Sequence, residues 1–145
     1  MENLIDNILI DIHKDNKEIL SYSLLSLAFL GDSIHSAFVR GKLVNDKTYK
    51  VKELHSKATK FVKASSQSYV LENLFEILTE EEKRIVGSAK NSKTNNIAKN
   101  ASIKDYKNAT ALESLFGFLA LSNNFERLNL LLNFSYDIIK NKENL

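Results

Sequence analysis

The chain has 145 residues, the length of one domain built around a single hydrophobic core. Hydrophobic residues make up 43% of it and charged residues 26%, which excludes a disordered chain, and the absence of cysteine excludes disulfides and thiolate zinc sites and agrees with a reducing cytoplasm. The net charge of +2 is too small to indicate nucleic-acid binding by itself, so the distribution of the charges has to decide that question.

Proline is absent and only four residues are glycine, so few strand-and-turn signals can be written in this chain. We therefore predict an all-α fold, with residues 1–145 as a single domain. The N-terminus lacks a charged start followed by an unbroken apolar core, so no secretory signal is expected. No run of about 18 uncharged apolar residues occurs, so no membrane span is expected either.

Two helices are predicted at the start of the chain. Residues 3–13 place apolar side chains on one helical face, and the polar stretch 14–17 breaks the pattern. A long second helix begins near Ser21 or Ser23, either of which can cap it, and runs to about Val44. It is apolar on most sides, which is typical of a helix at the centre of a bundle.

Asp32 is the one carboxylate in the middle of this apolar helix. An ionised carboxylate in an apolar setting is costly unless it is paired or binds a metal. Ala28 and Ser36 are small and leave room for a ligand to approach it. Gly31 indicates close contact with another backbone or a ligand, because glycine is about 1 kcal/mol worse than alanine inside a helix. His35 shares this face, where a histidine is more often a hydrogen-bonded structural residue than a ligand.

Two shorter helices follow, over residues 51–61 and 64–78. Lys57, Lys60 and Lys63 recur along one edge of the first, and a solvated face explains them about as well as an RNA-facing edge does. Five residues of the second are expected to supply core contacts: Tyr69, Leu71, Leu74, Phe75 and Leu78.

The last three helices complete a bundle of about seven. Residues 79–82 match a capping box, and the helix that they start fades near Asn91. Ser102 caps a helix that ends at about Leu121, and a final helix is expected over 125–140, followed by a fraying tail.

Between two of these helices, residues 88–104 contain lysines and small polar side chains and lack acidic residues through Lys104. One interpretation is a mobile surface loop. The other is an RNA-binding loop, in which lysines are point charges for phosphate and asparagines donate hydrogen bonds. The candidate RNA-binding residues are Lys90, Asn91, Lys93 and Lys99.

Glu113 is the only charged residue of the apolar stretch 109–121, which repeats the design around Asp32. Magnesium is usually held by one or two carboxylates together with waters and substrate phosphate. Asp32 and Glu113 on adjacent helices would meet that need. Two buried ion pairs with lysine or arginine explain the carboxylates equally well, and carboxylates alone do not identify a substrate.

Two motifs resemble signatures of a known family. LAFLGDSIHSAFVR, residues 27–40, resembles the first signature of ribonuclease III catalytic domains. ATALESLFGFLAL, residues 109–121, resembles the second, in which a glutamate is followed one turn later by a glycine, here Glu113 and Gly117. The resemblance extends to Mini-ribonuclease III, the short form without a double-stranded RNA-binding domain, in three further blocks: residues 55–68, 78–93 and 98–117.

The resemblance implies an all-helical ribonuclease III-like fold, a homodimer, dependence on Mg²⁺ and cleavage of double-stranded RNA. The Mini-type resemblance implies maturation of large-subunit (23S) ribosomal RNA precursor in the cytoplasm, and it allows a ribosomal protein on the substrate RNA as a further partner. By motif position, Asp32 and Glu113 are the expected catalytic residues and metal ligands. The alternatives are a non-catalytic RNA-binding or ribosome-associated module with the same fold, and a helical protein-interaction domain with buried ion pairs.

The sequence also departs from the family. Full-length ribonuclease III carries carboxylates where this chain has Ala28 and Thr110, and the Mini-type shares this thinner set. The Mini-type usually shows an arginine-rich block where this chain has residues 88–91, and a proline-containing block where it has 98–100. Fewer arginines mean fewer bidentate phosphate contacts, which affects RNA affinity rather than the metal site.

Overall fold

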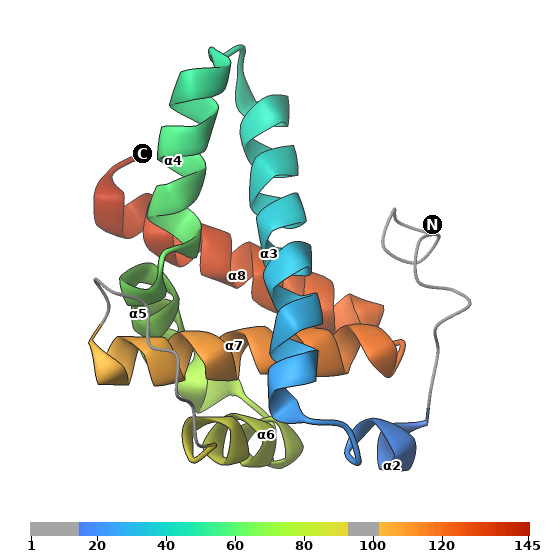
Figure 1. The fold of residues 1–145 in the computed structure, drawn as a ribbon. Coiled ribbons are helices and arrows are strands. Elements are labelled where there is room, and N and C mark those ends of the chain that lie inside the picture. Colours follow the sequence, from blue (N-terminus) through green and yellow to red (C-terminus); the bar gives the residue numbers. More distant parts are fainter. Residues whose placement is uncertain (1–14, 93–101) are drawn as a thin grey trace.

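The computed structural model describes residues 15–92 and 102–145, and throughout these residues the regular structure is helical (Figure 1). The predicted all-α bundle is confirmed. None of the described helices is long and apolar enough to cross a membrane. The helix predicted over residues 3–13 lies outside the described residues.

The helices are α2 (Asn16–Ile19), α3 (Leu24–Asp46), α4 (Val51–Val62), α5 (Ala64–Leu74), the 3-10 turn η2 (Phe75–Ile77), α6 (Glu80–Lys90), α7 (Ile103–Leu121) and α8 (Phe125–Glu143).

Three helices begin at the caps that the sequence predicts. The Ser23 hydroxyl accepts a hydrogen bond from the amide of Leu25 at the start of α3. At the start of α6, Thr79 and Glu82 exchange the two hydrogen bonds of a capping box, at 2.9 and 3.1 Å. Ser102 caps α7 through the amide of Asp105. Each cap satisfies an amide that the helix itself leaves unpaired.

Three boundaries differ from the prediction. The polar stretch expected as a break contains the short helix α2, because Asp15 caps it and Ile19 is fully buried. The helix expected to reach residue 78 ends at Leu74 and continues as η2. The last helix, expected to fray after residue 140, continues to Glu143.

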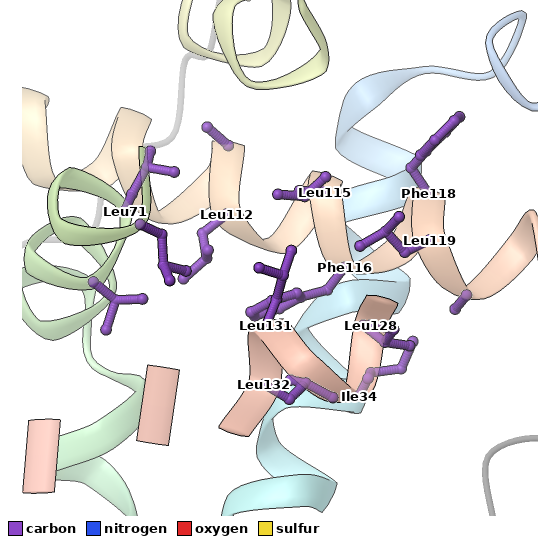
Figure 2. Packing of buried hydrophobic residues seen from close by; sticks show 14 of the residues in the cluster. Ile34, Leu71, Leu112, Leu115, Phe116, Phe118, Leu119, Leu128, Leu131 and Leu132 are labelled. Atoms are coloured by element: carbon purple, nitrogen blue, oxygen red, sulfur yellow. The ribbon is translucent and has the colours of Figure 1, made fainter. Parts of the chain in front are cut away.

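The core is built around α7, which packs most extensively on α3 and is flanked by α5 and α6. From Asn108 to Ala120, every residue of α7 except Glu113 is buried. Figure 2 shows Leu112, Leu115, Phe116 and Leu119 of α7 among leucines of α5 and α8. Glu113 is therefore the one position in this central stretch that reaches toward the surface.

The sequence predicts α3 as a helix at the centre of the bundle, but one of its apolar faces is exposed. Leu25 is 43% exposed and Phe29 is 85% exposed, although Leu27, Ile34 and Val39 are buried. The partners α4 and α7 leave this side of the helix uncovered. Tyr69 and Phe75, also expected in the core, are 36% and 40% exposed.

An ion pair between α6 and α8 closes the bundle at the end of η2. The Arg127 guanidinium donates to both carboxylate oxygens of Glu82, at 2.9 and 2.8 Å, and to the carbonyl of Ile77 at 2.7 Å. Burial opposes the ionisation of Glu82, but the hydrogen bonds from Arg127 and Thr79 outweigh it and hold the pKa of Glu82 below its ordinary value.

Candidate active site

Two glycines let α3 and α7 cross in backbone contact. A β-carbon at Gly31 would overlap the backbone of Glu113, and a β-carbon at Gly117 would overlap the backbone of Leu27. The Ser114 hydroxyl adds a hydrogen bond to the carbonyl of Leu24, at 2.8 Å. The contact predicted for Gly31 is therefore confirmed, and its partner is the backbone that carries the second carboxylate.

This crossing brings Asp32 and Glu113 together. They lie close enough for a protonated Glu113 to donate a hydrogen bond to the Asp32 carboxylate. Asp32 is exposed and Glu113 half-buried, so the expectation of an apolar setting holds for Glu113 alone. Neither forms an ion pair with a lysine or arginine within residues 15–92 and 102–145, so the ion-pair alternative has no support there.

The surroundings of Glu113 favour its neutral, protonated form. Burial raises the pKa of Glu113 to about 8, and the hydrogen bond and charge of Asp32 raise it in the same direction. A shared proton or a cation between two adjacent carboxylates relieves their repulsion.

His35 and Gln67 form a buried support beneath the site. The Nε2 atom of Gln67 lies 3.0 Å from Nδ1 of His35, and the His35 ring meets Phe116 edge-on. Burial lowers the pKa of His35 to about 4, against the opposing pull of Asp32, so the ring is neutral at pH 7. The structural interpretation of His35 is confirmed. Sequence reasoning missed Gln67, because nothing local indicates that a glutamine of α5 meets α3.

The donor set fits a magnesium ion. Two carboxylates supply hard oxygen ligands, and the exposed side of Asp32 leaves room for waters and a phosphate. The described residues contain no cluster of three or more histidine, cysteine, aspartate or glutamate side chains, so a closed all-protein cage is not formed there. Ala28 and Thr110, at the two positions noted above, are both buried.

The candidate RNA-binding residues are only partly described. Lys90, at the end of α6, is half-buried, with its ammonium 5.8 Å from the centre of the Phe75 ring. Asn91 is exposed and forms the C-cap of α6. Lys93 and Lys99 lie outside the described residues, so their prediction stays a prediction.

Comparison with known proteins identifies the family. Residues 25–124 match the ribonuclease III domain. The chain is 39% identical to Mini-ribonuclease 3 of Thermoanaerobacter sp. over 84% of its length and 86% of the relative's. It is 42% identical to Mini-ribonuclease 3 of Clostridium tetani, over 72% and 70% of the two chains.

A solved structure shares the fold. The crystal structure of a protein from Fusobacterium nucleatum superposes with a TM-score of 0.73 at 33% identity, covering 81% of this chain and 93% of the other. The two signature segments lie within the matched domain, on the helices that cross at Gly31 and Gly117. The chain therefore belongs to the ribonuclease III family of endoribonucleases, in its Mini-ribonuclease 3 branch.

Proposed function

We propose that this endoribonuclease depends on Mg²⁺ and cleaves double-stranded RNA, with Asp32 and Glu113 as catalytic residues and metal ligands. The single observation that carries the proposal is the pair itself: two adjacent carboxylates, lacking a cationic partner among the described residues, at the surface of an otherwise apolar helix crossing. Such a pair suits a hard divalent cation that keeps open positions for water and phosphate.

The two carboxylates have different tasks. Asp32 is exposed and would hold the cation from the solvent side of the site. Glu113 is more deeply placed and would hold it as the ionised carboxylate, which a bound cation would favour over the protonated form. When bound, the ion supplies charge stabilisation for the phosphodiester under in-line attack and lowers the pKa of the attacking water.

The proposal includes a homodimer. Leu25 and Phe29 are one helical turn apart on the exposed face of α3, and Asp32 follows on the same side. An aromatic ring that is 85% exposed is an apolar surface suited to a second copy. A two-fold interface there would set two carboxylate pairs on either side of the axis, so that both strands of a duplex are cut.

For the substrate, we propose the precursor of large-subunit (23S) ribosomal RNA, in the cytoplasm. This follows from the resemblance to Mini-ribonuclease III described above, and a ribosomal protein bound to that RNA is a compatible partner. Duplex RNA is recognised mainly through its shape and backbone. The proposed phosphate contacts are Lys90 and Asn91 at the end of α6, and Lys93 and Lys99, which follow them in the sequence.

The test compares wild type with Asp32→Asn and Glu113→Gln on a precursor-derived duplex, with magnesium and with chelator. We expect wild type to cut only with magnesium and both variants to lose cleavage while they keep their fold and their mass in solution. A normal rate in either variant would refute the assigned roles. Duplex binding without any metal-dependent cleavage by wild type would instead support the non-catalytic module.

A further inference from the structure

A groove lies between α3 and α4, along one side of the hairpin that these two helices form. Its inner part has a volume of about 60 Å³ and is lined by polar side chains: Ser36, Arg40, His55 and Thr59, with Ala58 and Val62. Its outer part, of about 190 Å³, is mostly apolar and shares Arg40, His55 and Ala58 with the inner part. The two parts therefore adjoin at these three residues.

The groove lies on the same side of α3 as the catalytic aspartate. Asp32, Ser36 and Arg40 are spaced four residues apart, so they follow one another along one helical face. Phe38, two residues from both Ser36 and Arg40, is about 200° around the helix, where it meets Tyr136 of α8. The groove therefore lies on the side of α3 that carries Asp32, opposite the side that meets Tyr136 of α8.

The chemistry of the inner part is that of an anion site. Arg40 and His55 are exposed, and Arg40 has no hydrogen bond or ion pair with any residue of 15–92 or 102–145. No acidic residue lines either part of the groove. The Thr59 hydroxyl donates to the backbone carbonyl of His55, at 2.9 Å, and its oxygen lines the same inner part of the groove as the His55 side chain.

We propose that this groove binds a backbone phosphate of the RNA strand that is cut at Asp32, with Arg40 as its main ligand. The proposal rests on the function proposed above. Along α3, Arg40 is about 12 Å from Asp32, a span of a few nucleotides. The arginine fork gives the bidentate phosphate contact that the lysines near α6 cannot give. His55, Ser36 and Thr59 surround the same phosphate as weaker polar partners.

The first test measures cleavage of duplex RNA as a function of salt for wild type, Arg40→Ala, Arg40→Lys and the charge-matched control Lys140→Ala. Lys140 is exposed on α8, away from the groove. For Arg40→Ala we expect KM to rise about tenfold with kcat nearly unchanged, and the slope of log KM against log salt to fall by about 1. Arg40→Lys should fall between, and Lys140→Ala should match wild type.

The second test removes the phosphate charge instead of the arginine. A duplex with a single neutral methylphosphonate, moved one nucleotide at a time from the cleavage site, should lose about tenfold in wild-type kcat/KM at one position. Arg40→Ala should show no further loss at that position, because the contact is already absent.

The outcomes separate the two proposals. Two results would overturn the groove as a phosphate site while leaving the nuclease function standing. One is that the losses in kcat/KM from the methylphosphonate and from Arg40→Ala add in full at every position. The other is that log KM of Arg40→Ala depends on log salt with the same slope as that of wild type. A wild type that neither binds nor cuts duplex RNA would overturn both.

Discussion

The carbonyl of Glu113 occupies the place that a β-carbon of residue 31 would need, so Gly31 is fixed by the same residue that supplies the second carboxylate. The distance between the two helices and the distance between the two acids are thus set together. A side chain at residue 31 would separate α3 from α7 and would pull Glu113 away from Asp32.

Alanine at Gly31 or Gly117 should therefore destabilise the fold by about 3 kcal/mol or more, because backbone has to move in a close-packed core. Gly41 and Gly87 are matched controls, since a β-carbon at either meets nothing within 4 Å. Alanine there should stabilise by about 0.5–1 kcal/mol, as expected inside helices. Denaturant unfolding of the four variants measures both effects, and equal losses at all four positions would contradict the crossing.

The raised pKa of Glu113 predicts how stability depends on pH without metal. Between its ordinary value of 4.5 and about 8, the folded chain holds a proton that the unfolded chain has released, so stability falls as pH rises through this window. Glu113→Gln lacks the ionisable group, so wild type should lose stability relative to this variant as pH rises toward about 8. Thermal unfolding in chelator tests this, and parallel pH profiles would contradict it.

Magnesium should reverse this effect. Binding requires the ionised form of Glu113, so apparent affinity should rise with pH up to about 8 and each ion should release up to one proton. Saturation at about 100 times Kd should stabilise wild type by about 2.7 kcal/mol. Calorimetry in buffers of different ionisation enthalpy counts the proton. Asp32→Asn is the control, and an equal stabilisation of that variant would place the ion elsewhere.

The pair between Glu82 and Arg127 should be important for stability. The side chain of Glu82 is 4% exposed and that of Arg127 is 22% exposed, so Arg127→Ala leaves a buried carboxylate unpaired and should cost about 3 kcal/mol. Lys83→Ala, which breaks an exposed contact with Glu80 at 3.8 Å, should cost less than about 0.5 kcal/mol.

The pair between Glu82 and Arg127 also predicts that the folded chain loses stability at low pH. Because the folded pKa of Glu82 is lowered, the stability that it contributes is present above the ordinary value of 4.5 and is lost as pH falls through the folded value. Acid unfolding of wild type and Arg127→Ala should therefore converge at low pH. A constant difference between the two curves would show that the pair contributes through packing alone.

Self-association should depend on Phe29. Phe29→Glu places a charge on the exposed face of α3 and should give monomers by light scattering, with loss of duplex cleavage. Leu130→Glu is the control, because Leu130 is 43% exposed on α8 and is outside the proposed interface. If Phe29→Glu kept the mass and activity of wild type, the interface would have to lie on another face.

The sequence predicted what local chemistry determines. Ser23, Thr79 and Ser102 were identifiable as caps because a cap and its partner lie within three residues of each other. The juxtaposition of Asp32 and Glu113 was also predictable, since each is the only carboxylate in a long apolar stretch. What failed was the assignment of exposed apolar residues: an apolar pattern does not distinguish a residue buried in its own core from one such as Phe29 that is left at the surface. Gln67 and Arg40 gave no local signal, because their roles depend on which helices meet.

Helix α3 is continuous from Leu24 to Asp46, so the distances between the functional residues along it are fixed. In the proposed functions, Phe29 contacts the partner subunit, Asp32 lies at the cleavage site and Arg40 binds a phosphate. Because all three residues are on one helix, its rise per residue sets the distances between them. Inserting a single residue between Asp32 and Arg40 would rotate Arg40 by about 100° around the helix axis relative to Asp32 and move it onto another side of the helix. Substitutions can change how strongly each of these residues contributes. The spacing between the cleavage site at Asp32 and the phosphate site at Arg40, however, is kept only by changes that preserve the helical register.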